Sequence, residues 1–187
     1  MNESIELIDG LSFENTQRLS YSVSLLRLSV EHRNSIHILV KHGLPGSAHA
    51  LARPQLEATI RGLWLADHAS DQEVQDYING SEPPGVHIQL DVLEKSTRFQ
   101  GALLRSAKQR NWKLMHDLTH AGAKQAGASI KSGTVAAGYS AQDLIALLDL
   151  AASTAAFSAA CMADTCGNRP VASKVAKQYA AIYRAEA

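Results

Sequence analysis

The chain has little cysteine, and what it has does not suggest a disulfide or a zinc site. Its two cysteines, Cys161 and Cys166, are five residues apart in an alanine-rich segment predicted to be helical. Side chains five positions apart do not face each other on a helix, so we expect two reduced thiols. Two cysteines also provide no cluster with zinc-finger spacing. The fold must therefore rest on an ordinary apolar core.

The chain also lacks an excess of charge of either sign. Lys and Arg together number 18, and Asp and Glu together also number 18. Proteins that bind mainly through nucleic-acid phosphates usually carry a basic excess. The balance excludes a broad nucleic-acid-binding face, although a small local basic patch is compatible with it.

Long hydrophobic runs are missing as well. No window approaches 18 uninterrupted apolar residues, and residues 1–10 carry acidic side chains without the apolar stretch of a signal peptide. We therefore expect a cytoplasmic protein without membrane contact. With 187 residues, 45% of them hydrophobic, the chain is expected to form one domain over residues 1–187.

The spacing of the apolar residues predicts an all-α protein. A first helix is expected from about Ser12 to Gly43, with a core stripe at Leu19, Val23, Leu26, Val30, Arg33, His37 and Val40. Further helices are expected over about Ser47–Ala69, Ser70–Asn79, Val86–Thr97, Ala102–Thr119, Ser140–Cys166 and Pro170–Ala185. Short turns between them indicate an antiparallel up-down bundle of five to seven helices.

Local signals mark several of these helix boundaries. Ser70 with Glu73, and Ser140 with Asp143, form the pattern of a capping box. Pro54 must either kink the second helix or lie in its first turn. Residues 121–138 contain four glycines among small residues and are predicted to be a glycine-rich loop. The alanine-rich Ser140–Cys166 helix permits close packing, either inside the domain or in a homodimer.

A row of polar side chains follows one face of the second helix. Arg53, Glu57, Arg61, Trp64 and His68 recur at helical spacing. Such rows are usually solvated, but a tryptophan within the row indicates that it is at least half-buried. Buried Arg and Glu side chains need partners on a neighbouring helix. We therefore predict that Arg53, Glu57, Arg61 and Trp64 are binding residues. Of these, Arg53, Glu57 and Arg61 are expected to face His116 and His120.

His116 and His120 are four residues apart and so share a helical face. Two imidazoles at this spacing can hold one metal ion, with Glu57, His37 or His49 as a further ligand. Alternatively, His120 interacts with the carbonyl groups at its helix end. Because third and fourth ligands are not obvious, we expect no bound metal and no cofactor, and we keep His120 as a binding residue.

Arg110 and His116 form the second candidate pair. An arginine can bind a scissile phosphate, and a histidine can carry the proton of an attacking 2′-hydroxyl group. This arrangement is typical of helical ribonucleases that need no metal. Arg110 and His116 are therefore the predicted catalytic residues.

Three segments resemble a family of uncharacterised bacterial proteins of about this length. They are Arg53–Ala58, Arg61–Leu65 and His116–Gly122, which carry the motifs Arg-Pro-x-x-Glu-Ala and His-Asp-x-Thr-His-x-Gly. This resemblance implies no activity.

Two more distant likenesses imply different functions. Arg110, Asn111 and His116 are similar to the signature of HEPN (higher-eukaryote-and-prokaryote nucleotide-binding) toxin and abortive-infection domains. That similarity implies a metal-independent ribonuclease with a toxin or phage-defence role, an RNA substrate and a small antitoxin partner. His116, His120 and Gln125 resemble metal-binding four-helix proteins of the damage-inducible type. A third alternative is a non-enzymatic interaction or ligand-binding module in which the charged row is structural.

Overall fold

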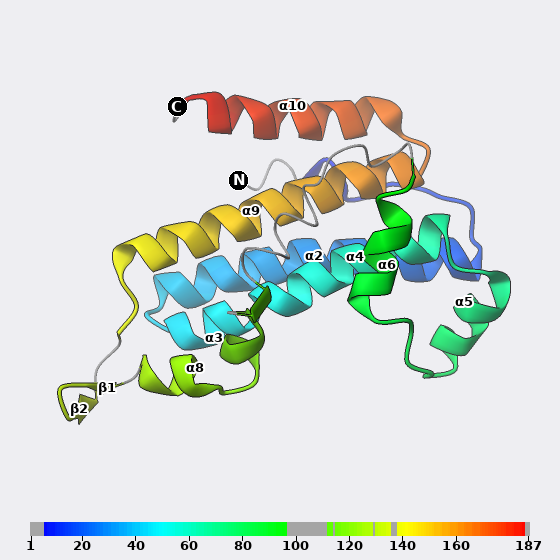
Figure 1. Ribbon diagram of the computed structural model, residues 1–187. Coiled ribbons are helices and arrows are strands. Elements are labelled where there is room, and N and C mark those ends of the chain that lie inside the picture. Colours follow the sequence, from blue (N-terminus) through cyan, green and yellow to red (C-terminus); the bar gives the residue numbers. More distant parts are fainter. Residues whose placement is uncertain (1–5, 97–111, 114, 129, 136–137, 186–187) are drawn as a thin grey trace.

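The structure is a computed structural model that describes residues 6–96, 112–113, 115–128, 130–135 and 138–185. This part of the chain contains eight numbered helices and one short hairpin (Figure 1). The helices are α2 (Gln17–Lys41), α3 (Pro45–Ala50), α4 (Ala52–Asp67), α5 (Asp71–Ile78), α6 (Val86–Leu93), α8 (Ala123–Gly127), α9 (Ala141–Thr165) and α10 (Arg169–Ala185). The strands are β1 (Ile130–Lys131) and β2 (Thr134–Val135), which pair antiparallel. The predicted all-α bundle is confirmed.

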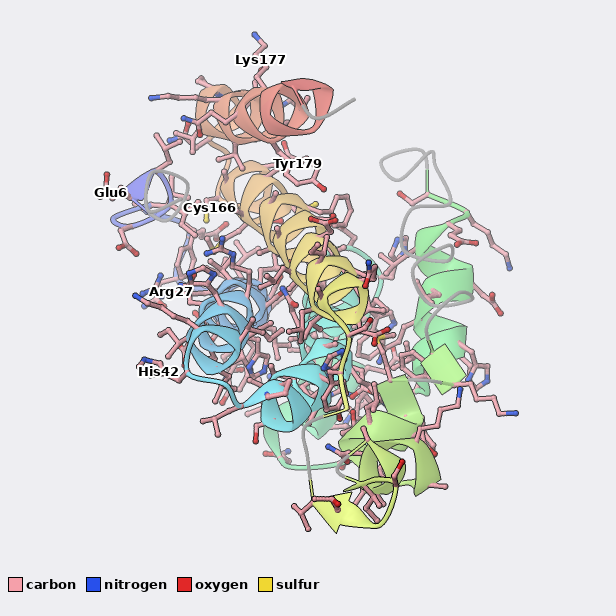
Figure 2. All side chains as sticks on the ribbon, turned by 90° about the vertical axis from the view of Figure 1, so that its left-hand side faces the viewer. Glu6, Arg27, His42, Cys166, Lys177 and Tyr179 are labelled. Atoms are coloured by element: carbon pink, nitrogen blue, oxygen red, sulfur yellow. The ribbon has the colours of Figure 1, made fainter. Side chains whose placement is uncertain are left out.

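Three helices form the centre of the bundle. The helices α2, α4 and α9 pack against one another, α10 lies on the outer side of α9, and α6 packs against α4. Figure 2 looks along α9 and shows Lys177 extending from α10 away from the bundle. The largest side chains of the core are Leu26, Ile36, Leu56, Ile60, Leu63, Leu90 and Leu93.

Small polar side chains allow α2, α4 and α9 to approach closely. The hydroxyl of Ser22 donates to the carbonyl oxygen of Gly62 at 2.8 Å. The Thr59 hydroxyl lies 2.8 Å from the hydroxyl of Ser29 and 2.8 Å from that of Ser158, one on each neighbouring helix. Because these buried hydroxyls satisfy one another, they can occupy the core without the usual cost of burying a polar group.

The buried face of α2 differs from the predicted stripe. Its buried residues are Ser22, Leu26, Ser29, Val30 and Ile36. Leu26 and Val30 were predicted, and Val23 and Val40 of the predicted stripe are partly buried against the core. The other predicted residues of the stripe are also only partly buried. The apolar pattern missed Ser22 and Ser29 because hydrogen-bonded serines replace apolar side chains where the helices come closest.

Two segments differ from the predicted secondary structure. The expected second helix is divided at Leu51 into α3 and α4, so Pro54 lies in the first turn of α4, where its missing N–H leaves no hydrogen bond unmade. The predicted loop over residues 121–138 contains α8 and the hairpin. These two differences raise the helix count above the predicted five to seven. The expected fourth helix ends earlier than predicted, at Leu93 with Glu94 as its C-cap, and the expected start of the fifth helix lies outside the described residues.

Both predicted capping boxes are present, and they make stability sensitive to acid. Hydrogen bonds from the backbone and hydroxyl of Ser70 lower the pKa of Glu73, and those from Ser140, the hydroxyl first, lower the pKa of Asp143. A carboxyl group with a lowered folded-state pKa stabilises the fold above its unfolded pKa of about 4. That contribution is lost as the pH falls through the folded-state pKa.

We therefore expect the Ser70→Ala/Ser140→Ala double variant to lose less stability than wild type on acidification. Urea unfolding at about pH 7 and at about pH 3 measures this difference, because the interval spans the titration of both carboxyl groups. An equal loss in the two proteins would contradict the role of the caps.

The helix α9 is long and rich in apolar residues. It is the one helix in the described part of the chain that is long and apolar enough to cross a membrane, and 39% of its most apolar 18-residue window is buried in the fold. A single helix of this kind is weak evidence for a span, because central helices of water-soluble bundles share the same composition.

Candidate arginine–histidine site

The site is centred on Arg53, in the first turn of α4. Its Nε donates to Glu57 Oε1 at 2.7 Å, one helical turn along α4, and the two side chains are only 19% and 24% exposed. Its guanidinium carbon lies 4.7 Å from the ring centroid of Trp112. The salt bridge and the cation–π contact together hold the guanidinium in a defined position.

Arg53 also contacts both histidines of the facing helical segment, residues 115–119 and the turn after it. Its Nη1 donates to His116 Nδ1 and, at 3.2 Å, to His120 Nε2. The two imidazole centroids are 4.6 Å apart, with the ring planes at 57°. Of the three residues predicted to face His116 and His120, Arg53 contacts both, and Glu57 is linked to them through Arg53.

These contacts define which ring nitrogens carry protons. A guanidinium group only donates hydrogen bonds, so His116 Nδ1 and His120 Nε2 must accept. In each neutral imidazole the other nitrogen, His116 Nε2 or His120 Nδ1, then carries the N–H group. Nη2 of Arg53 makes no hydrogen bond to any residue that the structure describes. The site therefore offers several N–H donors, a pattern suited to an anion.

The same contacts disfavour a metal ion. The two nitrogen lone pairs that would bind it both point to Nη1 of Arg53, so a metal would have to displace a cation that Glu57 holds in place. Within the described ranges, no group of three or more His, Cys, Asp or Glu side chains is arranged to hold a metal.

The remaining residues of the His116–Gly122 motif position the segment. Asp117 Oδ2 accepts from the backbone N–H groups of Lys124 at 2.7 Å and Gln125 at 3.3 Å, at the start of α8. The Thr119 hydroxyl lies 2.7 Å from the Met115 carbonyl oxygen and 3.3 Å from that of Ala50. Asp117 and Thr119 therefore anchor the histidine segment to α8 and to the end of α3.

Alanine at position 122 should disrupt this anchor. A Cβ atom on Gly122 would lie 2.2 Å from Asp117 Oδ1, so the carboxylate would have to leave the N–H groups of α8. We expect Gly122→Ala to cost about 1–3 kcal/mol of unfolding free energy and to shift the ring resonances of His120. Thermal unfolding and NMR measure the two effects. Gly127→Ala, with no atom within 4 Å of the new Cβ, is the matched control, and an equal effect there would refute the explanation.

A comparison with protein-family models places the chain in a family. One model matches residues 26–185, and its description is a family of unknown function (DUF6988). The chain belongs to DUF6988. The predicted membership of an uncharacterised family is confirmed, and the whole arginine–histidine site lies within the matched region. Comparison with curated proteins and with solved structures finds no match.

Two other predicted binding residues of this DUF6988 protein lie elsewhere on α4. Trp64 is 3% exposed and packs in a separate apolar cluster with Leu65 and Val74, so it does not reach Arg53. Arg61 is half-buried, and its Nε has no hydrogen-bond partner in the described part of the chain. Trp64 is buried, as its place in the row indicated, but the elements that cover it differ from those that cover Arg53 at the other end of α4. Arg110 lies outside the described residues.

Sequence reasoning missed the aromatic residue that does contact Arg53. Trp112 is four residues before His116 and so shares its helical face. The four-residue spacing between Trp112 and His116 could therefore have placed Trp112 at the arginine–histidine site.

Proposed function

We propose that this site binds a phosphate group of RNA. The observation that carries the proposal is the single Arg53 Nη1 shared by His116 and His120, which leaves Nη2 and two imidazole N–H groups for a ligand. N–H donors around a fixed guanidinium complement phosphate oxygens, and charge assistance makes such hydrogen bonds strong. The neutral chain as a whole limits the contact to one or two phosphates.

The two histidines further support metal-independent cleavage of that RNA. When Arg53 turns to the phosphate, it releases the two ring nitrogens that accept from it. The freed nitrogen of one histidine takes the proton of the 2′-hydroxyl group, whose oxygen bonds to phosphorus. The freed nitrogen of the other histidine binds a proton from water, which makes that ring an imidazolium ion. The bond from phosphorus to the 5′ oxygen breaks, and that oxygen takes a proton from the imidazolium ion. The products are a 2′,3′-cyclic phosphate and a 5′-hydroxyl group.

This mechanism resembles that expected of a HEPN-like ribonuclease, and we include a HEPN-like function in the proposal. In it, Arg53 binds the phosphate, the role that the sequence analysis gave to Arg110. Histidine still carries the proton, as predicted for His116. A toxin or phage-defence role, a small antitoxin partner, a homodimer and a cytoplasmic location belong to the same proposal.

Binding and cleavage can be tested separately with one RNA sequence in two forms. A fully 2′-O-methylated oligonucleotide cannot be cleaved and measures binding, whereas the unmodified form in chelator measures cleavage. We expect wild type to bind with a slope of log K against log salt of about −0.7 per phosphate contacted. His116→Ala and His120→Ala should weaken binding and abolish cleavage.

His42→Ala is the control, because His42 is an exposed histidine at the C-cap of α2 that points out of the bundle in Figure 2. It should behave as wild type. Equal activity of His116→Ala and wild type would show that any cleavage comes from a contaminating nuclease. Absence of both binding and cleavage would refute the proposal and favour a non-enzymatic interaction module.

A further inference from the structure

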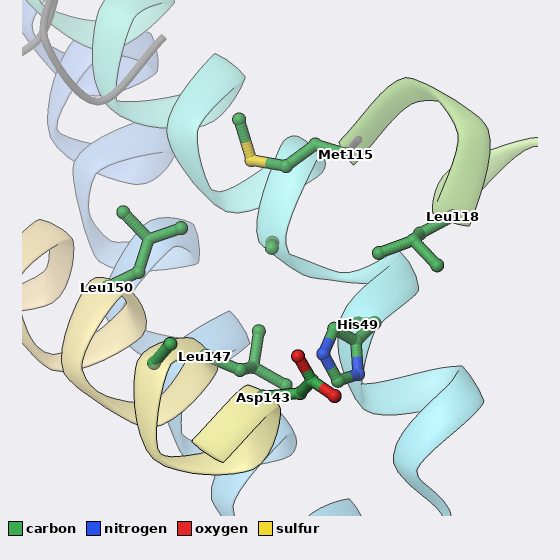
Figure 3. A pocket seen from close by; sticks show the side chains of 8 residues that line it. His49, Met115, Leu118, Asp143, Leu147 and Leu150 are labelled. Atoms are coloured by element: carbon green, nitrogen blue, oxygen red, sulfur yellow. The ribbon is translucent and has the colours of Figure 1, made fainter. Parts of the chain in front are cut away.

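A cavity of about 180 Å³ opens beside the central helices (Figure 3). Its apolar walls come from α4, α9 and the histidine segment, through Ala52, Met115, Leu118, Ala146, Leu147 and Leu150. An apolar cavity of about 150 Å³ in another protein is large enough to bind benzene. The present cavity can therefore take one six-membered ring with a short substituent.

His49 on α3 is one of two polar residues that line the cavity. It is only 8% exposed, and its Nδ1 donates to the carbonyl oxygen of Pro45 at 2.9 Å. Because a carbonyl oxygen only accepts, Nδ1 carries the proton and Nε2 of the neutral ring is an acceptor. Tyr139 stacks on the ring with centroids 4.5 Å apart, which holds the imidazole in this orientation.

Asp143 is the second polar residue, and Figure 3 shows its carboxylate beside His49 at one end of the cavity. Its Oδ2 accepts from the backbone N–H and the hydroxyl of Ser140, at 2.9 and 2.7 Å. Its Oδ1 makes no hydrogen bond to a residue in the described ranges. The cavity thus presents two acceptors and a negative charge, which is the opposite of the donor-rich Arg53 site.

We propose that this cavity binds a small apolar molecule that carries an amino or amidinium group. The ring or alkyl body lies among the aliphatic side chains, where burial of apolar surface favours it. The N–H groups of the cationic end donate to Asp143 Oδ1 and His49 Nε2. The carboxylate disfavours an anionic ligand of the same shape. This inference does not rest on RNA binding at Arg53.

Benzylamine is a suitable test compound, with benzyl alcohol and benzoate as neutral and anionic analogues. Methyl NMR of the full chain should show shifts at Met115 and Leu147, with a Kd for benzylamine on the order of 1 mM or below. Benzyl alcohol should bind at least about tenfold more weakly, because it has no positive charge to pair with Asp143, and benzoate more weakly still, because the carboxylate repels it.

Two variants separate the cavity from its charged end. Asp143→Asn keeps an oxygen for the Ser140 cap and should weaken benzylamine about tenfold while leaving benzyl alcohol unchanged. Ala146→Phe fills the cavity from its exposed side and should abolish binding of both. Glu73→Gln makes the equivalent change in the cap of α5, away from the cavity, and should leave benzylamine binding at the wild-type level.

Three results would overturn the proposal. They are benzoate binding as tightly as benzylamine, binding that survives Ala146→Phe, and no shift at the cavity methyl groups with any of the three compounds. Unfolding midpoints of each variant show whether a loss of binding merely reflects a loss of the fold.

Discussion

Lysine in place of Arg53 is expected to lower cleavage of single-stranded RNA by at least about a hundredfold, the usual effect of removing one fixed donor from a catalytic site. Before RNA binds, Arg53 uses Nε for Glu57 and Nη1 for both histidines, and Nη2 is left for the first contact with the phosphate. An ammonium group is a single point charge and cannot serve these directions at once. Single-turnover cleavage in chelator, with protein in excess over RNA and at a concentration above Kd, gives the rate for each protein.

The matched control is Arg27→Lys. Arg27 is 55% exposed and pairs with Asp9 on the surface at 2.9 Å, so its replacement should leave the cleavage rate unchanged. If Arg53→Lys cleaves at the wild-type rate, the guanidinium does not act on the phosphate and the proposed mechanism is wrong. If it binds the methylated RNA normally but does not cleave, Arg53 acts on the chemical step and not on affinity.

Leucine in place of Gly62 is expected to have the largest effect on stability. A Cβ atom at this position would lie 3.0 Å from Leu26 Cγ and 3.1 Å from the Ser22 carbonyl oxygen, where α2 and α4 cross. The larger side chain must push the two helices apart and break the bond from the Ser22 hydroxyl to the Gly62 carbonyl. We expect a loss of about 3 kcal/mol of unfolding free energy.

For a chain of this length that loss corresponds to a fall in Tm of about 6–12 °C, measurable by circular dichroism or calorimetry. Gly127→Leu introduces the same side chain in α8, where no atom lies within 4 Å of the new Cβ, and should cost less than about 1 kcal/mol. Equal losses in the two variants would show that helix propensity, and not the crossing of α2 and α4, sets the cost. Normal RNA binding by folded Gly62→Leu would separate the fold from the site.

One side of the histidine segment faces the apolar cavity and another faces Arg53, so amine binding and RNA cleavage can be separated. Met115 lines the apolar cavity, whereas the adjacent His116 contacts Arg53. Adjacent residues on a helix point about 100° apart, so one short segment contributes to both sites. Variants at Asp143 or Ala146 should therefore change amine binding without changing RNA cleavage.

What the sequence alone determined was local. Both capping boxes lie within four residues of chain, so Ser70–Glu73 and Ser140–Asp143 could be recognised without knowing the fold. The shared faces of Arg53 with Glu57, and of His116 with His120, follow from helical geometry in the same way. Their mutual contact could be predicted as well, because buried polar groups on two helices are best satisfied by one another.

The tertiary structure alone decided which elements cover each face. Trp64 and Arg53 share a face of α4, yet Trp64 is buried in a separate apolar cluster and Trp112 contacts Arg53. Ser29 and Thr59 are buried because hydroxyls from three helices form hydrogen bonds with one another. The spacing of hydrophobic residues cannot predict such hydrogen bonds. The ordered α8 depends likewise on Asp117, whose carboxylate caps a helix that its own glycines and alanines do not predict. Periodicity along one helix shows which residues share a face. Which side chains cover that face depends on how whole helices pack, so the neighbours of Trp64, Thr59 and Asp117 could not be predicted from it.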